Sequence, residues 1–523
     1  MPRVNAPVRG EDEHARTNDD QRWAAAPDAR PAGRALWKVF AVAAVVRLAC
    51  FPFAENKQCD APMRSLLAER MNTQPGAAAD PRGFFQYGPL PIEVMRPFML
   101  VDRDARRSSR WPSLLAGLAV FAPFFSLASR MGATEPAALM LAGLALALSS
   151  LHVQVSTTAA SEALYLFLFV STLDRLHAAL SARRFRDFLL AGLLGSLAAV
   201  TRYDMWLSLP SAAAAALWCG RRDRRPVTEV ALFLGASAVF PVAYLAWLRA
   251  TTGDPLFFAH FIRHDHATMA AAVSSRLGPG IARLRQIVIW LLAFAAAMTP
   301  LPFVALAGVL RHPPQLSVAT RVVLIAALAP IVVYLIQGLV FGQFEPLARF
   351  AIVPGTVLLP IAAVELARWR SAPRSPRARI GLSAGLAVAL GLMTALLAHA
   401  GPGRIWGGAE SFEAVTRLDP EDRALARFLE AHVRPEEGVF IDPLGFSDIA
   451  IAHAARIPAG RTATLAWTRT PSPTVAETRA RTFASWFAAH DWSWGRTPIP
   501  DWPADGVRLG RWRVARFWPA APR

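Results

Sequence analysis

The chain of 523 residues is 54% hydrophobic and has a mean hydropathy of +0.31, values that are typical of membrane proteins and exclude an ordinary soluble enzyme. Most of its arginines, which give a net charge of +18, lie in short clusters between apolar runs, where they set membrane topology; no basic aromatic domain of the usual nucleic-acid-binding kinds is present. The cysteines are Cys50, Cys59 and Cys219, which excludes a disulfide framework and a CxxC metal pair.

Residues 1–34 are polar and rich in Arg, Asp and Pro, which predicts a disordered cytoplasmic N-terminus. Residues 35–398 alternate apolar runs with polar linkers and predict a polytopic all-α membrane domain of about eleven transmembrane helices. The expected spans are 35–54, 111–129, 134–151, 161–180, 187–201, 205–219, 230–248, 287–310, 322–341, 350–367 and 380–398. Residues 399–523 carry more Pro and charge and predict a small extracytoplasmic α/β domain, with a helical pattern at 421–432 and a strand-like run at 438–441.

The distribution of arginine among the linkers predicts the orientation of the chain. The linkers 175–186, 221–225, 311–321 and 368–379 carry two or more Arg each, whereas 152–160, 202–204 and 342–349 carry at most one. The positive-inside rule places the first set in the cytoplasm, so the long loop at 55–110 should lie outside, as should Glu162, Arg202 and Arg349. Residues 187–219 would form about 50 Å of helix against a hydrocarbon core of about 30 Å, so they predict a hairpin that turns at 202–204.

One acid, Asp60, follows the first span and is expected near the membrane interface. A carboxylate there can take a proton from an acceptor hydroxyl. The alternative is a solvated loop acid, as expected for Glu55, Asp80 and Glu93 in the same stretch. Residues 62–70 predict an amphipathic helix that lies on the membrane surface, with Glu69 on its solvated face.

Several runs, taken in order, resemble the GT-C superfamily of membrane glycosyltransferases, most closely the bacterial family 39 members related to protein O-mannosyltransferases and to the lipid A aminoarabinose transferase. The run 60–64 (DAPMR) has the acid of the family's Asp-Glu-x-x-Tyr pattern without its second acid or its tyrosine. The run 87–91 (YGPLP) resembles the Pro-Leu-Tyr-like segment that follows, and 110–117 resembles the entry to the second helix. The run 161–164 resembles the start of a span with an outer acid near the active site. The run 201–204 (TRYD) and Arg349 resemble arginine-containing turns of the family, the second of which meets the donor's phosphate.

The resemblance implies a polyprenyl-phosphate-linked sugar donor, no cofactor, and single displacement with inversion. Asp60 would be the general base, Glu162 a second candidate catalytic acid, and Arg349 and Arg202 the groups that bind the donor phosphate. Arginine suits this task because its planar guanidinium binds phosphate oxygens bidentately and stays charged; the alternative is an interfacial anchor whose charge reaches the headgroups. The residues expected to contact substrate are Arg64, Tyr87, Asp204 and His264.

Two further features leave alternatives open. His260 and His264 stand four residues apart, a spacing that can bind a divalent metal on one helix face. The alternative for this stretch is an outer helix near the substrate, with Arg263 or His264 touching phosphate or sugar. Arg47 is a charge in the outer half of the first span, and it is expected to act in the site, to face lipid or to pair within the bundle.

These features together predict a hexosyl- or pentosyltransferase of the bacterial inner membrane that acts on a cell-envelope glycan, with its active site facing the periplasm. Its acceptor would be a lipid, a glycan or a protein, and membrane lipids are expected partners. A transporter or flippase of lipid-linked substrates is the rival interpretation, and it should show repeated halves or charges near the bilayer midplane. A non-catalytic relative with an incomplete site is the second rival.

Overall fold

The computed structural model describes residues 30–57, 60–73, 88–219, 226–298, 301–311, 316–344, 346–371, 380–381, 384–385, 388, 417–441, 447–458, 461–463, 484–490 and 506–516. The expected disordered N-terminus and the last expected span, 380–398, fall largely outside these residues. Tyr87 also falls outside them.

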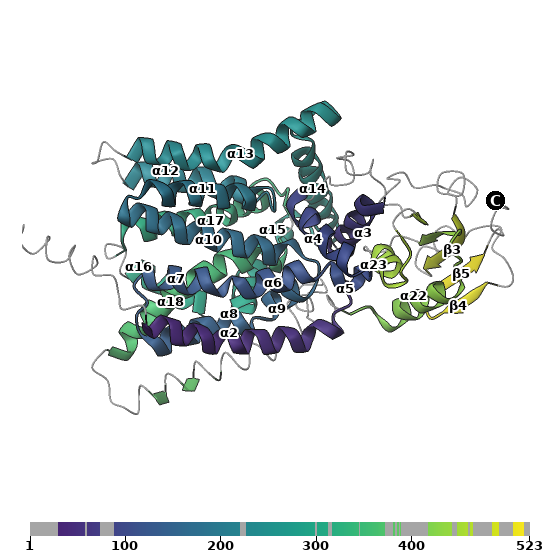
Figure 1. Ribbon diagram of the computed structural model, residues 1–523, viewed down its shortest axis with the longest axis horizontal. Helices are drawn as coiled ribbons and strands as arrows, with labels where there is room; N and C mark the ends of the chain where they lie inside the picture. The colour runs from purple at the N-terminus through teal and green to yellow at the C-terminus, as the bar shows by residue number, and fades with distance from the viewer. Residues whose placement is uncertain are drawn as a thin grey trace, which may run out of the picture.

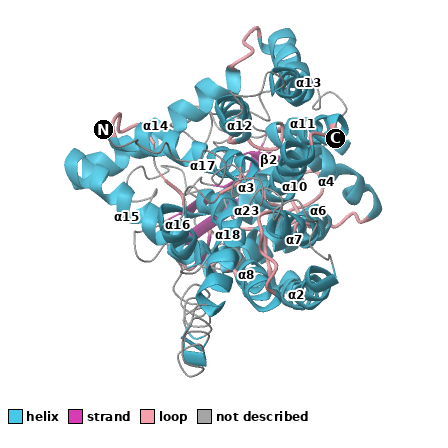
Figure 2. Cartoon of the chain, turned by 90° about the vertical axis from the view of Figure 1, so that its left-hand side faces the viewer, coloured by secondary structure: helices cyan, strands magenta, loops and turns pink. Residues whose placement is uncertain are grey.

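Helices packed side by side form the larger part of the protein, and a smaller α/β part lies at one end of them (Figure 1). The helices before residue 220 are α2 (Arg30–Cys50), η1 (Phe51–Phe53), α3 (Asp60–Thr73), α4 (Pro89–Val101), α5 (Ala105–Ser108), α6 (Trp111–Ala119), α7 (Phe121–Arg130), α8 (Pro136–Leu148), α9 (Ser150–Thr157), α10 (Ser161–Ala182), α11 (Phe185–Ala199) and α12 (Met205–Cys219). The helices between residues 226 and 371 are α13 (Pro226–Thr252), α14 (Phe257–Leu277), α15 (Pro279–Met298), α16 (Leu301–Arg311), α17 (Val318–Leu339), η5 (Ala348–Ala351) and α18 (Ile352–Ser371). In the perpendicular view, α14 and α15 stand at the edge of the bundle farthest from α2 (Figure 2).

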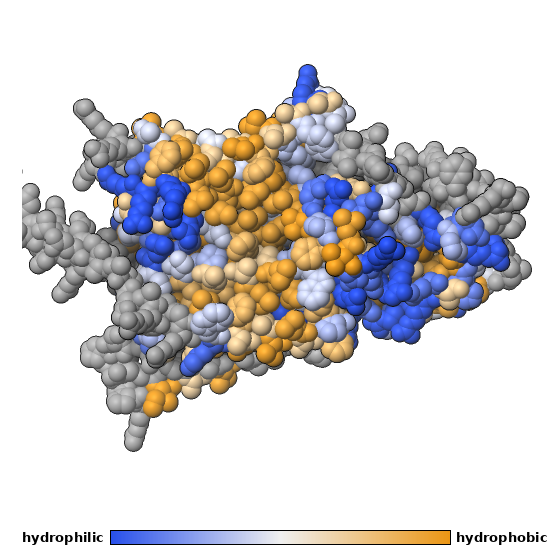
Figure 3. Space-filling model, viewed as in Figure 1, coloured by the Kyte–Doolittle hydropathy of each residue, from blue (hydrophilic) through white to orange (hydrophobic). Residues whose placement is uncertain are grey.

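The helical part is a multi-pass membrane protein. Six helical stretches of the described chain are long and apolar enough to cross a bilayer, and the bent pair α8–α9 makes a seventh if it counts as one span. A belt of hydrophobic side chains crosses the middle of the bundle, with hydrophilic residues toward both ends (Figure 3). Exposed Val239, Phe240 and Leu291 point outward from α13 and α15, as expected for side chains that face lipid.

The observed helices differ from several of the expected spans, and they confirm the hairpin. The span expected at 134–151 bends by 53° between α8 and α9, and the span expected at 287–310 is divided into α15 and α16. Residues 187–219 form two helices, α11 and α12, joined by a turn at 200–204, as predicted.

Arg47 closes the bend between α8 and α9. Its guanidinium donates to the carbonyl oxygen of Ala147 at 3.0 Å and lies 2.7 Å from Nδ1 of His152. A bend in a helix leaves backbone carbonyls without their usual partners, and a buried cation satisfies them. Of the three roles open for Arg47, the structure therefore shows pairing within the bundle.

The expectation that residues 62–70 lie on the membrane surface is wrong. Helix α3 is buried from Asp60 to Ala68, and it packs against α4 and against Ile449 from the far end of the chain. Glu69 is half-buried, and burial raises the pKa of its carboxyl group. The prediction of a helix was correct, but residues 60–68 are buried without a break, so this part of α3 is enclosed by protein instead of lying on lipid.

The C-terminal segment, residues 417–516, contains a small mixed sheet and two helices. These elements are α22 (Pro420–His432), β1 (Gly438–Ile441), α23 (Ser447–Ala454), β2 (Thr462–Ala463), β3 (Ala484–His490), β4 (Val507–Leu509) and β5 (Trp512–Arg516). The strand order is β2-β1-β3-β5-β4, with β1 parallel to β2 and β3 and the other pairings antiparallel. Buried Trp512 and Leu425 belong to its core, and α23 faces α3 of the membrane part.

Candidate active site

Three acids converge where several helices begin; Asp60 and Glu162 are buried, and Asp204 is partly buried. Asp60 is the first residue of α3, Glu162 is in the first turn of α10, and Asp204 directly precedes α12. The amino end of a helix carries a partial positive charge and unpaired N–H groups, so it favours a carboxylate. The helix starts therefore explain how the chain can place three acids together in a buried site.

Three arginines alternate with these acids. Arg349 in η5 places Nη2 2.9 Å from Oδ2 of Asp60 and Nε 3.5 Å from Oε1 of Glu162. Arg202 places Nη1 2.7 Å from the same Oε1 of Glu162 and Nε 2.8 Å from Oδ2 of Asp204.

Arg64 completes the series, because its Nη2 lies 3.6 Å from Oδ2 of Asp60, one helical turn away. We call these residues the charge chain, and in order they are Arg64, Asp60, Arg349, Glu162, Arg202 and Asp204.

The charge chain is electrostatically balanced, since acids and arginines alternate along it. Burial acts to lower the pKa of Arg202, but the carboxylates of Asp204 and Glu162 raise it above its usual value. A buried charge without its partner is strongly destabilising, so the loss of one member would leave its neighbours without their compensating charge. An added anion would therefore have to take over one of these existing pairings.

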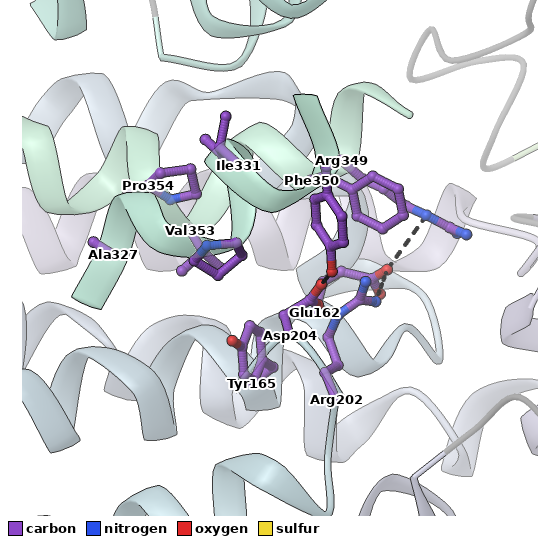
Figure 4. Close-up of a pocket in the computed structure, with 12 residues that line it drawn as sticks. Glu162, Tyr165, Arg202, Asp204, Ala327, Ile331, Arg349, Phe350, Val353 and Pro354 are labelled. Carbon is purple, nitrogen blue, oxygen red and sulfur yellow. Dashed lines mark hydrogen bonds and ion pairs between the residues drawn. The ribbon is translucent and has the colours of Figure 1, made fainter. Parts of the chain in front are cut away.

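A cleft opens beside the charge chain, with charged groups at one side and an apolar wall at the other (Figure 4). The guanidinium carbon of Arg202 lies 5.5 Å from the ring centre of Phe350 and 5.9 Å from that of Tyr165. The hydroxyl of Tyr334 donates to Asp204. The residues that line the cleft are Glu162, Tyr165, Arg202, Asp204, Ala327, Pro330, Ile331, Tyr334, Arg349, Phe350, Val353 and Pro354. Such a lining suits a molecule with an anionic head and an apolar body.

The turn that carries Arg202 is held by a close backbone approach. The N–H of Leu90 donates to the carbonyl oxygen of Val200 at 3.2 Å, which joins the start of α4 to this turn. A Cβ atom on Gly88 would lie 2.2 Å from that same oxygen, so only glycine fits. Tyr203 stacks on Phe258 with ring centres 4.0 Å apart and secures the other side of the turn.

His266 lies next to the charge chain and was not among the residues expected in the site. Its ring stacks on Phe344 with centres 4.6 Å apart and lies 6.2 Å from Phe350. Burial, followed by the charge of Arg349, lowers the pKa of His266 to about 4, so the ring is neutral at neutral pH. The only available signal was its place two residues beyond His264, which puts the two on different faces of α14.

The structure brings together six of the eight residues expected in the site: Asp60, Glu162, Arg349, Arg202, Arg64 and Asp204. His264 is exposed on α14, and Tyr87 lies outside the described residues. His260 is also exposed, with Nδ1 2.9 Å from Oδ2 of Asp254. In the part of the chain that the structure describes, no group of three or more His, Cys, Asp and Glu side chains is placed to hold a metal ion.

Comparison of sequences gives one family match. The family described as dolichyl-phosphate-mannose-protein mannosyltransferase matches residues 88–247, a region that contains Glu162, Arg202 and Asp204. Comparison with curated protein sequences gave no match.

Solved structures match the fold over most of the chain. ArnT from Cupriavidus metallidurans, solved bound to undecaprenyl phosphate, has a TM-score of 0.61 at 14% identity, covering 93% of this chain and 98% of that one. Its apo state has a TM-score of 0.57 at 14% identity, covering 91% and 96%. The Archaeoglobus fulgidus oligosaccharyltransferase in its apo form has a TM-score of 0.55 at 14% identity, covering 87% and 69%. The expected resemblance is confirmed: the chain has the fold of the GT-C superfamily and resembles its mannosyltransferase and ArnT members.

Proposed function

We propose that this protein transfers a hexose or a pentose from a polyprenyl-phosphate donor to a hydroxyl or amine acceptor at the periplasmic face of the bacterial inner membrane. The observation that carries the proposal is the charge chain, which places acids and arginines beside a cleft with an apolar wall. The fold comparisons support it, because ArnT was solved with undecaprenyl phosphate and the A. fulgidus enzyme with a dolichol-phosphate.

Arg349 is the group we assign to the donor phosphate, with Arg202 behind it. In the absence of substrate, Arg349 pairs with Asp60 at 2.9 Å and also reaches Glu162. A phosphate that takes over Nη2 of Arg349 would replace one anionic partner by another, so the arginine stays paired throughout. The same exchange would release Asp60 from its strongest pairing at the moment when the donor is in place.

Asp60 is then the base of an inverting displacement. Its carboxylate accepts the proton of the acceptor while the acceptor oxygen or nitrogen forms a bond to the anomeric carbon. The bond from that carbon to the phosphate oxygen breaks on the opposite face, and the electron pair leaves with the polyprenyl phosphate. Arg349 and Arg202 stabilise the negative charge that develops on this leaving group.

Glu162 has a different role in this proposal from the catalytic one expected. It accepts from Nη1 of Arg202 at 2.7 Å and lies 3.5 Å from Nε of Arg349, so it holds the two phosphate-binding groups side by side. We therefore assign it to positioning. The apolar wall, which includes Ile331, Val353 and Pro354, would take the first part of the lipid.

The test is consumption of donor by the purified full-length protein in lipid nanodiscs. A panel of undecaprenyl-phosphate-linked hexoses and pentoses is supplied with a cell-envelope extract as acceptor, and release of undecaprenyl phosphate is followed by mass spectrometry. The proposal expects one donor class to be consumed, with the sugar recovered on an acceptor. Movement of intact donor across proteoliposomes without release of undecaprenyl phosphate would instead establish the transporter or flippase, and binding without either event would establish a non-catalytic relative.

A further inference from the structure

Asn56 occupies a strained and buried position between the first span and α3. Its side chain is 1% exposed, and its backbone has a φ of 59°, in the left-handed region. Among residues other than glycine, asparagine tolerates this conformation best. The chain therefore turns sharply at Asn56, four residues before Asp60.

The amide of Asn56 joins three parts of the protein that are distant in sequence. Its Oδ1 accepts a hydrogen bond from the N–H of Ala159 at 2.7 Å, three residues before Glu162. Its Nδ2 donates to Oγ of Ser65, in the same helix as Asp60, at 2.9 Å and faces Nε2 of His453 on α23 at 3.3 Å. One side chain thus connects two of the three segments that carry acids of the charge chain to the C-terminal segment.

The residues on either side of Asn56 are also bound to the C-terminal segment. Glu55 accepts from the guanidinium of Arg423 at 2.9 and 2.7 Å and from the N–H of Leu418 at 2.8 Å. Lys57 donates to Oδ2 of Asp419 at 2.9 Å. These contacts are partly exposed and contribute little each, whereas the bonds of Asn56 are buried and their loss leaves polar groups unpaired.

Apolar packing supports the same junction. Ile449 of α23 is fully buried among residues of α3 and α4, including Leu66 and Met95. Arg106 donates to the carbonyl oxygen of Ala454 at 3.2 Å, just beyond it. The C-terminal segment therefore forms a backing for the helix that begins with Asp60.

We propose that Asn56 is a positioning residue. Together with the C-terminal segment, it fixes α3 against the segment before Glu162, and it thereby aligns Asp60 with the phosphate-binding arginines. This inference rests on the proposed function. The geometry of a reacting site must be held closely, since a displacement of about 1 Å can lower turnover about 10²-fold. Asn56 touches neither the cleft lining nor an arginine of the charge chain, so its effect should fall on turnover more than on donor binding.

The experiment compares Asn56→Gly with Lys57→Ala in the full-length protein. Glycine keeps the left-handed backbone without cost and removes all three side-chain contacts, whereas Lys57→Ala removes only the neighbouring exposed ion pair. We expect Asn56→Gly to lower kcat about 10- to 100-fold, with KM for the donor and Kd for undecaprenyl phosphate within about threefold of wild type. Lys57→Ala should leave all three quantities nearly unchanged.

Hydrogen–deuterium exchange supplies a readout that does not depend on the reaction. In Asn56→Gly, the backbone amides of α3 and those at 158–162 should both exchange faster, although the two segments are remote in sequence. Wild-type kcat in Asn56→Gly, or faster exchange in α3 alone, would overturn the inference. If Asn56→Gly does not fold, the same measurements are made on Asn56→Asp and judged by the same criteria. This variant keeps the acceptor for the N–H of Ala159 and loses the donor to Ser65.

Asp60→Asn measured alongside separates the two proposals. Loss of turnover in Asp60→Asn with wild-type kcat in Asn56→Gly would overturn the inference about Asn56 and leave the proposed function standing. Full turnover in Asp60→Asn would show that Asp60 is not the base. Hydrogen–deuterium exchange in Asn56→Gly would then decide whether Asn56 holds α3 in place.

Discussion

Asp60 sits between two arginines, Arg64 and Arg349, and its substitution tests the proposed base directly. Asp60→Asn keeps the shape of the side chain but cannot accept a proton at working pH. General-base catalysis contributes about 10²–10⁴-fold, so kcat should fall by that much while undecaprenyl phosphate still binds. Donor consumption and lipid binding by the purified variant measure the two effects separately.

A matched control is needed because the substitution also removes a buried charge. Glu69 is unsuitable because it is half-buried, whereas Glu93 is exposed on α4 and pairs only across one helical turn with Arg96. Glu93→Gln should be nearly silent. Equal losses from the two variants, or full activity of a folded Asp60→Asn protein, would dismiss Asp60 as the base.

Arg349 offers a graded test of phosphate binding. Removing a charged hydrogen bond to phosphate costs about 1.5–3 kcal/mol, so Arg349→Ala should weaken binding of undecaprenyl phosphate by about 10- to 150-fold. Arg349→Lys retains the charge but loses the planar fork, and its loss should be smaller. Titration of the purified variants with undecaprenyl phosphate measures both. Wild-type affinity in the alanine variant would take Arg349 out of the phosphate site.

His453 gives the junction at Asn56 a predictable dependence on pH. Burial, followed by the charges of Arg106 and Arg110, lowers the pKa of His453 to about 3, from a value near 6.5 in an unfolded chain. Between those values the unfolded chain binds more protons, so the free energy of unfolding should fall as the pH falls below about 6.5. Thermal unfolding from pH 7 to pH 4 should show this decline, and His453→Gln should show less of it than wild type does.

At the residue scale, the sequence predicted which charged residues lie together better than how they pair. Asp60, Glu162, Arg202 and Arg349 could be found because each lies beside an apolar run on the same predicted side of the membrane. Their pairing could not be found, since Asp60 and Arg349 lie far apart in the sequence and meet only in the folded protein. His266 was missed because stacking on Phe344 leaves no trace in local sequence.

At the scale of elements, the junction between α4 and the 200–204 turn depends on Gly88. A Cβ atom there would lie 2.2 Å from the carbonyl oxygen of Val200, so backbone must move in Gly88→Ala and Arg202 must move with its turn. We expect at least a tenfold loss of turnover together with a lower thermal midpoint, since strain of this kind costs on the order of 1–3 kcal/mol. Unchanged turnover would show that the turn does not position Arg202.

A second glycine provides the comparison. Gly235 lies within α13, and a Cβ atom there would meet no atom within 4 Å. Because alanine is the better helix former, Gly235→Ala should leave turnover unchanged and the thermal midpoint equal or higher. A loss in both variants would mean that the assay responds to any change in the helices.

Helix α3 shows why elements were easier to predict than their surroundings. The periodicity of 62–70 indicated an amphipathic helix, and a helix is present. Its residues 60–68 are nevertheless buried without a break, because α4 and Ile449 pack on it, and the local sequence does not show which elements surround a helix. The bend between α8 and α9 was missed for a similar reason, because the carbonyl group that it exposes, that of Ala147, accepts a hydrogen bond from Arg47 on another helix.

At the scale of the whole molecule, the orientation in the membrane remains a prediction. Ala182 and Thr251 are both exposed, at the ends of α10 and α13. In a background without Cys50, Cys59 and Cys219, an impermeant maleimide should label Thr251→Cys in intact cells and Ala182→Cys only after the membrane is opened. The reverse pattern would place the charge chain on the cytoplasmic side and overturn the proposed location of the site.

The bundle and the C-terminal segment were predictable to different degrees. Apolar runs and arginine-rich linkers indicated most of the helices, and the family resemblance indicated how they are arranged. The mixed sheet was indicated only by the strand-like run at 438–441, since its remaining strands are short. Nothing local to Asn56 or His453 indicates that they meet, because they are separated by 397 positions in the chain.

That separation has a consequence for how the protein is made. A chain emerging from the ribosome inserts its helices in order, and domains made first generally fold first. Helix α3 nevertheless meets Ile449, and Asn56 meets His453, only after most of the polypeptide has been synthesised and α23 has reached the same side of the membrane. A nascent or shortened chain that lacks α23 would thus carry all the arginines and acids of the charge chain without the contacts of Ile449 and His453, and activity would begin only after α23 has been made.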